Sequence, residues 1–200
     1  PVVLTAPSAP TITNVASTDP TDCNVADGTI TITALGTGVL EYSIDGGTTW
    51  FTNNGNFTGI AGGTYNTAVR NAIGVTCQVT GPIATLIDKV APTISTVAST
   101  NITDCGNTDG TITITASGTG SVEYSINGGV AWQPSNVFSA LVAGTYEVRI
   151  RNIDGTCEVS DVDVIITAPV APIIDNTVAT NPTGCGTNDG QIVITATFLS

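Results

Sequence analysis

The chain repeats itself with a period of about eighty residues, which is the feature that most limits its possible folds. Cys23 recurs as Cys105 and Cys185, after 82 and 80 residues, and Cys77 recurs as Cys157, again after 80. Matched strings keep the same offsets, among them Asp27-Gly28, Asp109-Gly110 and Asp189-Gly190, Glu41 to Ile44 with Glu123 to Ile126, and Arg70-Asn71 with Arg151-Asn152. A fixed period of this length predicts a tandem array in which each period is one structural module.

Proline-containing segments separate the repeats, at residues 7–10, 90–92 and 169–172. Proline fixes its own φ and has no amide hydrogen, so it ends strands and stiffens a linker. We expect four parts, namely the last strand of a preceding repeat at 1–8, complete repeats at 9–90 and 91–170, and the opening of a third, truncated repeat at 171–200. Short linkers of this kind favour a semi-rigid rod, and we expect the segment to belong to a longer protein.

Within a repeat the hydrophobic period is two. Residues 29–34 read Thr-Ile-Thr-Ile-Thr-Ala, which places isoleucine on one face of a strand and threonine on the other. The segments Asp45-Gly46-Gly47 and Asn127-Gly128-Gly129 follow similar strands and predict hairpin turns. Many short strands with regular turns indicate an all-β protein.

Two tyrosines at matched positions point to a more specific fold. Tyr65 and Tyr146 follow Gly-Thr in both complete repeats, as in a tyrosine corner, where the phenol bonds to nearby backbone at a Greek-key crossing. A tyrosine that stacks on a sugar is the alternative role. We predict tandem Ig-like (Greek-key) β-sandwich modules.

The charge balance limits the partners. Lys and Arg total 4 against 16 Asp and Glu, so the formal net charge is −12. A surface this acidic cannot neutralise phosphates, so we expect no nucleic acid and no docking on anionic lipid. The apolar runs are also too short to cross a bilayer, so no membrane insertion is expected.

The residue types exclude most catalytic constellations. The chain has no His, so a Ser-His-Asp or Cys-His site cannot form, and its one lysine, Lys89, lies in a linker. The matched carboxylates of Asp22, Asp27 and Glu41 are better explained by turn hydrogen bonds and solvation than by a paired-acid active site. We therefore predict no catalytic residues and no enzyme.

We expect no metal site and no cofactor. Calcium is the alternative that stays open, because Asp22, Asp27 and nearby carbonyls could supply oxygen ligands. Their spacing matches no calcium-loop motif, and Asx turns explain the same residues.

Two cysteines per complete repeat predict disulfides in an oxidising, extracellular setting. The favoured pairing is Cys23 with Cys77 and Cys105 with Cys157, which leaves Cys185 over. It requires that residues 56–60 not form a full crossing strand, since otherwise Cys23 and Cys77 lie at opposite ends of the sandwich. The rival pairing joins successive repeats, Cys77 with Cys105 and Cys157 with Cys185. Thiols that are free or bind a metal are the third alternative.

Trp50 and Trp132 follow the two hairpins and are the candidates for contact with an extracellular surface or glycan. Partly buried packing is the other interpretation of both side chains.

The order of these motifs resembles the SprB repeat. The shared strings are Asp-Gly-Thr-Ile-Thr-Ile-Thr-Ala, then Glu-Tyr-Ser-Ile-Asp/Asn-Gly-Gly with a following Trp, then Gly-Thr-Tyr and a downstream Cys. The resemblance implies a very large cell-surface adhesin of Bacteroidota, exported by type IX secretion and active in adhesion or gliding motility.

These observations favour a structural stalk or spacer whose partners are neighbouring repeats and, through strand edges, other copies in a fibre. The alternative is that each repeat binds a glycan or surface weakly and acts by avidity. A third hypothesis has the repeats display a distant catalytic domain.

Overall fold

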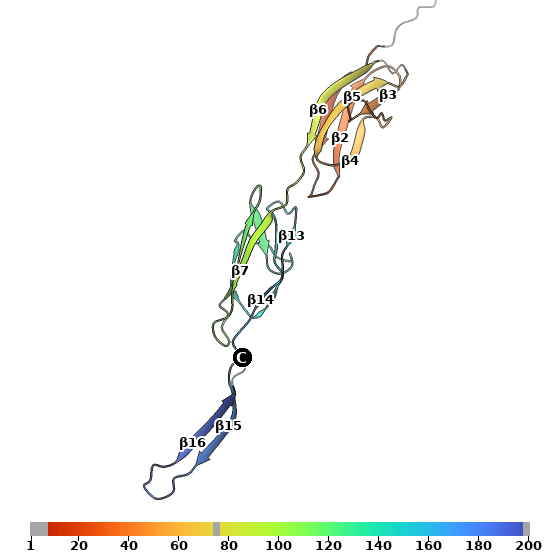
Figure 1. Cartoon of the computed structure of the whole chain (residues 1–200). Coiled ribbons are helices and arrows are strands. Elements are labelled where there is room, and N and C mark those ends of the chain that lie inside the picture. Colours follow the sequence, from red (N-terminus) through yellow and green to blue (C-terminus); the bar gives the residue numbers. More distant parts are fainter. Residues whose placement is uncertain (1–7, 74–76, 198–200) are drawn as a thin grey trace, which may run out of the picture. The chain divides into compact units, whose positions relative to one another are not determined.

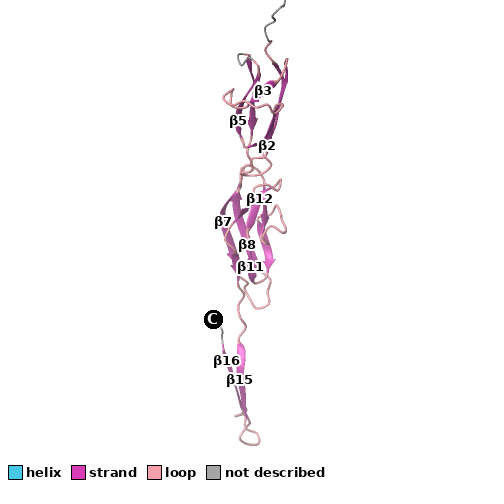
Figure 2. Cartoon of the chain, turned by 90° about the vertical axis from the view of Figure 1, so that its right-hand side faces the viewer, coloured by secondary structure: helices cyan, strands magenta, loops and turns pink. Residues whose placement is uncertain are grey.

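The computed structural model describes residues 8–73 and 77–197. Within these ranges every regular element is a strand (Figures 1 and 2). No helix in the same ranges is long and apolar enough to cross a membrane. Of the strand expected at 1–8, all but Ser8 lies outside the described residues.

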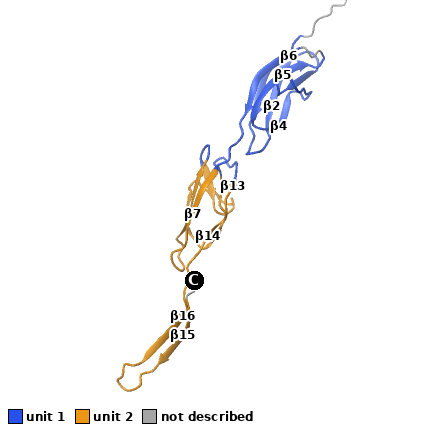
Figure 3. Cartoon of the chain, in the orientation of Figure 1, with its two compact units in different colours: residues 1–92, 118–121, 151–158 blue, residues 93–117, 122–150, 159–200 orange. Residues whose placement is uncertain are grey.

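The chain forms two compact units, coloured separately in Figure 3. Unit 1 comprises Pro1–Pro92, Gly118–Ser121 and Arg151–Glu158, and unit 2 comprises Thr93–Ser117, Val122–Ile150 and Val159–Ser200. Unit 1 thus holds the first repeat together with two short segments of the second, 118–121 and 151–158. The boundaries expected from the sequence, at 90 and 170, assign both segments to the second repeat.

The described part of the first repeat folds into two three-stranded sheets, in the orders β1-β2-β4 and β3-β5-β6. Neighbouring strands in both sheets are antiparallel. The strands are β1 (Thr11–Thr18), β2 (Gly28–Leu35), β3 (Leu40–Ser43), β4 (Asn56–Ile60), β5 (Gly63–Asn71) and β6 (Gln78–Leu86). Because β2 pairs with β4 while β3 pairs with β5, the chain crosses between the sheets as in a Greek key.

Both sheets contribute to one core. Ile30 and Ile32 of β2 are 0% and 1% exposed, as the alternating pattern predicts. They pack in a single buried cluster with Phe57 of β4 and, from the other sheet, Tyr42 and Val69. The prediction of an all-β, Ig-like sandwich is confirmed.

A buried serine organises the hairpin turn after β3. Ser43 Oγ donates to Asp45 Oδ1 at 2.7 Å and accepts the N–H of Gly47 at 2.9 Å. Gly46 and Gly47 have φ values of 76° and 96°, which a side chain would disfavour. The amides of Thr48 and Thr49 also donate to the Asp45 carboxylate, and these bonds, with that from Ser43, lower the pKa of Asp45 to about 2.

The second repeat follows the same plan, except that each of its last two long strands is divided into two short ones. Its sheets have the orders β10-β8-β7 and β13-β12-β9, and β11 pairs with β14. The strands are β7 (Thr93–Thr100), β8 (Gly110–Ser117), β9 (Val122–Ser125), β10 (Val137–Leu141), β11 (Gly144–Tyr146), β12 (Arg149–Asn152), β13 (Val159–Ser160) and β14 (Val164–Ile166). Ile112, Ile114 and Ile150 are 0% exposed in the core of unit 2.

The opening of the third repeat is one antiparallel hairpin, β15 (Ile173–Thr180) with β16 (Gln191–Thr197). Its register matches that of β7 with β8, including a shift after the second pair. The local strand pattern is therefore the same in all three repeats.

The two matched tyrosines make the same backbone contact. Tyr65 Oη donates to Ala61 O at 2.9 Å, and Tyr146 Oη donates to Val142 O at 2.8 Å. Each bond reaches four residues back and closes the turn that leads into β5 or β11. This is the geometry of a tyrosine corner, and both side chains are half-buried.

Candidate functional site

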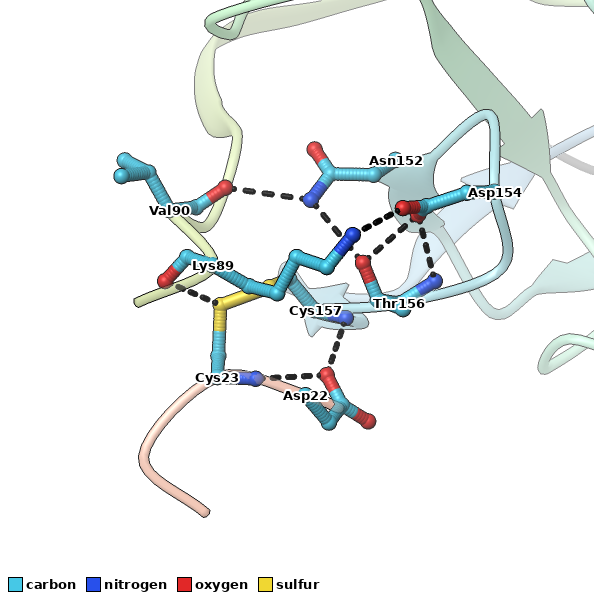
Figure 4. The surroundings of a disulfide bond; sticks show 8 residues. All are labelled: Asp22, Cys23, Lys89, Val90, Asn152, Asp154, Thr156 and Cys157. Carbon is cyan, nitrogen blue, oxygen red and sulfur yellow. Dashed lines mark hydrogen bonds and ion pairs between the residues drawn. A yellow bond between two sulfur atoms is a disulfide. The ribbon is translucent and has the colours of Figure 1, made fainter. Parts of the chain in front are cut away.

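A disulfide links the first repeat to the second within unit 1 (Figure 4). It joins Cys23, in the loop between β1 and β2, to Cys157, in the hairpin after β12. The Cα atoms are 5.1 Å apart, in the usual range for a disulfide, and 134 residues separate them in the sequence. The site is therefore a covalent junction between repeats.

The predicted pairs Cys23 with Cys77 and Cys105 with Cys157 are wrong, because Cys23 and Cys157 bond to each other. Residues 56–60 do form a crossing strand, β4, so the condition on which the first pair depended fails. Asp19, before the Cys23 loop, accepts the N–H of Ile87 just beyond β6, whereas Cys77 lies just before β6. The length of β6, ~26 Å for nine residues, separates the two cysteines.

The rival pairing between repeats fails as well. It assigned Cys157 to Cys185, but Cys157 is already bonded and Cys185 is an exposed thiol. Cys105 is likewise an exposed thiol, so its proposed bond to Cys77 does not form. A disulfide between repeats exists, but it joins an early cysteine to the late cysteine of the next repeat.

The Cys23 loop is held in shape by two aspartates. Asp27 accepts the backbone N–H of Thr21 at 2.8 Å and the hydroxyl of Thr21 at 2.5 Å. These bonds, the hydroxyl bond first, lower the pKa of Asp27. Asp22 Oδ1 accepts the N–H of Cys23 at 2.7 Å, and Asn24 adopts a left-handed φ of 58°. The loop is thus built around Cys23 by local hydrogen bonds.

The Cys157 hairpin presents its cysteine in an uncommon conformation. Cys157 has a φ of 59°, a left-handed value that is costly for a side chain of this kind. Its N–H donates to Asp22 Oδ1 at 2.7 Å, so one carboxylate oxygen binds the amides of both bonded cysteines. Figure 4 shows this bridge beside the disulfide. Asp22 and the disulfide together hold the strained residue in place.

An ion pair and an amide bond join the linker to the same hairpin. Lys89 Nζ lies 2.7 Å from Asp154 Oδ2, and Asn152 Nδ2 donates to Val90 O at 3.1 Å. The bond from Lys89, with those from Thr156, lowers the pKa of Asp154 to about 2, and Asp154 raises the pKa of Lys89. Cys23 Sγ lies 3.2 Å from Lys89 O; this is a contact, because a disulfide sulfur has no proton to donate.

A shallow pocket of about 370 Å³ opens beside this junction. Its charged groups, Asp88, Lys89 and Asp154, already bind protein partners, since Asp88 accepts the N–H of Gly62 and the other two pair with each other. Its remaining lining includes the apolar side chains of Ile87 and Ile153. The pocket lies beside the linker, and its charged side chains are all engaged with other parts of the protein.

The acidic groups of the loop already have hydrogen-bond partners within the protein. The ligand atoms of Asp22, Cys23 and Cys157 lie within 4.8 Å of one another, but disulfide sulfurs are not the thiolates that metals bind. Both oxygens of Asp27 accept hydrogen bonds from Thr21. These Asx-type contacts account for the residues that suggested calcium.

Trp50 is half-buried, and a cation covers it. The Arg70 guanidinium carbon lies 4.3 Å from the centre of the Trp50 ring. Arg70 Nε in turn lies 2.6 Å from Glu41 Oε2, with both charged side chains about one-fifth exposed. The Arg70 guanidinium, on β5, therefore lies between the indole and the carboxylate of Glu41 on β3, and it covers one face of the indole.

Trp132, the matched tryptophan, is also half-buried. It lines a pocket of about 220 Å³ together with Ile126, Asn127, Ala131, Gln133 and Phe138. The pocket thus brings an indole together with two primary amides, although Asn127 Oδ1 accepts from Ser125 and Ala131 and Gln133 Nε2 donates to two backbone carbonyls.

Sequence reasoning missed the residues that support the junction. Asp22 was interpreted as a turn residue, and Lys89, Asn152 and Asp154 were given no contact across repeats. One signal was present, because an aspartate precedes the early cysteine in both complete repeats, at Asp22 and Asp104. A carboxylate next to a cysteine can accept that cysteine's own N–H and also the N–H of a cysteine from another repeat, as Asp22 does.

Comparisons with family models and with curated proteins give no match. Among solved structures, the chain is similar to the fibronectin(III)-like modules of Clostridium thermocellum CbhA, with 20% identity, a TM-score of 0.33 and coverage of 80% of this chain and 94% of that one. It is also similar to extracellular domains 3–5 of Drosophila OTK (16% identity, TM-score 0.39, coverage 80% and 63%) and to domains 1–6 of surface layer protein SbsC (15%, 0.31, 87% and 30%). No conclusion about function follows from likeness at these levels.

Proposed function

We propose that this chain is a non-enzymatic structural spacer of an extracellular repeat protein, in which disulfides between successive repeats limit how far the chain can be stretched. The observation that carries the proposal is the bond between Cys23 of the first repeat and Cys157 of the second. A disulfide also supports an oxidising, extracellular location.

The mechanical consequence follows from the sequence separation. A force applied at the ends of the chain passes through the disulfide and bypasses the 134-residue segment it closes. Even after both sandwiches unfold, that segment cannot extend, and it would otherwise add ~480 Å at ~3.6 Å per residue. A bond within one repeat would protect a much shorter segment, so a bond between repeats suits a spacer under load.

The tryptophan environment and the surface charge also favour a spacer over a binding module. Arg70 covers one face of Trp50, which leaves that face unable to stack on a sugar. The net charge of −12 keeps neighbouring copies apart in solution. The resemblance to the SprB repeat extends the proposal: the spacer would belong to a cell-surface adhesin exported by type IX secretion, with a role in adhesion or gliding.

Single-molecule stretching of the whole chain tests the proposal. We expect the fully extended length to grow by ~480 Å when the chain is reduced with dithiothreitol. A Cys157→Ser variant should show the longer length without reductant, and Cys185→Ser is the matched control that should behave as the parent. Equal lengths for the oxidised and reduced parent would contradict the spacer mechanism.

A second candidate function rests on the pocket that Trp132 lines. If each repeat binds glycan weakly, the whole chain should bind saturably to members of a glycan panel, and Trp132→Ala should abolish that binding. Trp50→Ala is the matched variant in the first repeat, and circular dichroism of both variants separates a loss of binding from unfolding. Absence of binding by the folded parent leaves the spacer as the function of these repeats.

A further inference from the structure

The loop around Cys105 in the second repeat has the same construction as the loop around Cys23. Asp104 Oδ1 accepts the N–H of Cys105 at 2.7 Å, the distance found between Asp22 and Cys23. Asp109 accepts the backbone N–H and the hydroxyl of Thr103, as Asp27 does from Thr21. Gly106 takes the left-handed φ, 80°, that Asn24 takes in the first loop.

The linker after the second repeat also runs past Cys105 as the first linker runs past Cys23. Cys105 Sγ donates to Pro169 O at 3.3 Å, and Cys23 Sγ lies 3.2 Å from Lys89 O. At the start of this linker Asn101 accepts the N–H of Thr167 at 3.0 Å, matching the bond from Ile87 to Asp19 at 2.8 Å. The two loops therefore have nearly the same shape. They differ in bonding, because Cys23 forms a disulfide whereas Cys105 is an exposed thiol.

We propose that Cys105 and Asp104 form the receiving half of a second junction, which takes the cysteine hairpin of a following repeat. The occupant has a definite chemistry, namely a tight hairpin that offers a cysteine thiol in a left-handed conformation and, from the same residue, a backbone N–H. The first junction supplies the independent observation, since the Arg151–Glu158 segment occupies the equivalent loop there through both Cys23 and Asp22.

Bond formation at this site is an oxidation. The thiols of Cys105 and of the incoming cysteine lose two protons and two electrons as the sulfur–sulfur bond forms. A small-molecule disulfide such as oxidised glutathione accepts these two protons and two electrons and is released as two molecules of reduced glutathione. Asp104 takes no part in the electron transfer; it holds the incoming amide while the sulfurs meet.

The third repeat contains a natural control. Its loop keeps the bond from Thr183 to Asp189 and the left-handed glycine, Gly186, with φ of 81°. However, Gly184 stands where Asp22 and Asp104 stand, so the carboxylate that receives the incoming amide is absent from this loop. Cys185 should therefore accept a cysteine hairpin less readily than Cys105.

An extended chain tests the inference. Residues 171–200 match 91–120, so adding a copy of residues 121–170 after Ser200 completes a third repeat. After equilibration in a glutathione buffer and alkylation, we expect proteolytic peptides that join Cys105 to the copied Cys157. Asp104→Gly should lower the equilibrium constant for this bond by at least about tenfold, because one amide-to-carboxylate hydrogen bond is lost.

The bond between Cys23 and Cys157 is the internal reference. This inference rests on the proposed spacer, but the two can fail separately. If Cys23 is bonded to Cys157 and Cys105 is alkylated, only the inference is overturned. If Cys23 and Cys157 are not bonded, the spacer itself is overturned. If hydrogen exchange shows that the added repeat is unfolded, the parent chain is instead incubated with a peptide of residues 149–160, and the mixed disulfides on Cys105 and Cys185 are measured. A mixed disulfide on Cys105 exceeding that on Cys185 by about tenfold or more supports the inference, and equal amounts overturn it.

Discussion

The carboxylate of Asp22 accepts the backbone N–H of Cys157 at 2.7 Å, across 135 residues of sequence. The same oxygen accepts the N–H of Cys23, so it binds both ends of the disulfide. We expect Asp22→Gly, which copies the third repeat, to make the disulfide at least about tenfold easier to reduce, because a hydrogen bond to a charged group is lost. Equilibration with glutathione measures this, and Asp22→Asn, which keeps one acceptor oxygen, should lie between the two. An unchanged equilibrium constant for Asp22→Gly would contradict this role for Asp22.

Loss of the disulfide should lower stability. Closing a 134-residue segment restricts the unfolded chain, and the loop-entropy treatment gives an upper figure of about 5 kcal/mol for a closure of this length. We expect Cys157→Ser to unfold at lower urea concentration than the parent, as followed by circular dichroism. The parent measured with reductant should match the variant. A variant as stable as the oxidised parent would show that the bond restricts no unfolded state.

The Trp50 stack should contribute to the stability of the first repeat. Arg70→Ala removes both the guanidinium above the indole and the partner of Glu41, and we expect a loss of about 1 kcal/mol in the free energy of unfolding. Trp50 fluorescence should also shift to the red as water reaches the ring. Arg70→Lys keeps the charge but loses the planar contact, so it should recover only part of the stability. No spectral change in Arg70→Ala would contradict the stacked arrangement.

The tyrosine corners allow a paired comparison. Tyr65→Phe and Tyr146→Phe each remove one hydrogen bond to a carbonyl four residues earlier and leave the ring in place. We expect a loss of about 1 kcal/mol in each repeat, measured by urea unfolding. Because the two bonds are equivalent, a large effect in one repeat and none in the other would contradict the common role.

Acid should destabilise the chain from about pH 4 downward. The pKa values of Asp45 and Asp154 are about 2, below the usual value near 3.9 for Asp. A carboxylate with a lowered folded pKa contributes its stability above its unfolded pKa and loses it as the pH falls through the folded value. The urea midpoint should therefore be level from about pH 5 to pH 8 and then fall toward pH 2. In Asp45→Asn this fall should be smaller, and an equal fall would contradict the low pKa of Asp45.

The strands and the tyrosine corners could be predicted because they depend on neighbours in the sequence. Alternation at Ile30 and Ile32 identifies the buried face, and a phenol that reaches four residues back needs no knowledge of the rest of the fold. The disulfide partner of Cys23 could not be found in this way. It depends on which loops of different repeats share one end of a sandwich, and a count of two cysteines per repeat fits several pairings.

The predicted bond between Cys23 and Cys77 depended on residues 56–60 not forming a crossing strand, and this condition could already have weakened that pairing. Once β4 is a crossing strand, Cys23 and Cys77 lie at opposite ends of β6, so any disulfide partner of Cys23 comes from another repeat. The supporting contacts, such as Lys89 with Asp154, follow only after that partner is known, because neither residue has a matched charge in the other repeats.

The early cysteine of the first repeat bonds to the late cysteine of the second. Peptide mapping of the oxidised, alkylated whole chain by mass spectrometry, without reduction, tests it most directly. We expect one linked pair of peptides that contains Cys23 and Cys157 and separates on reduction. A linked pair that contains Cys23 and Cys77 would contradict it and restore a disulfide within the repeat.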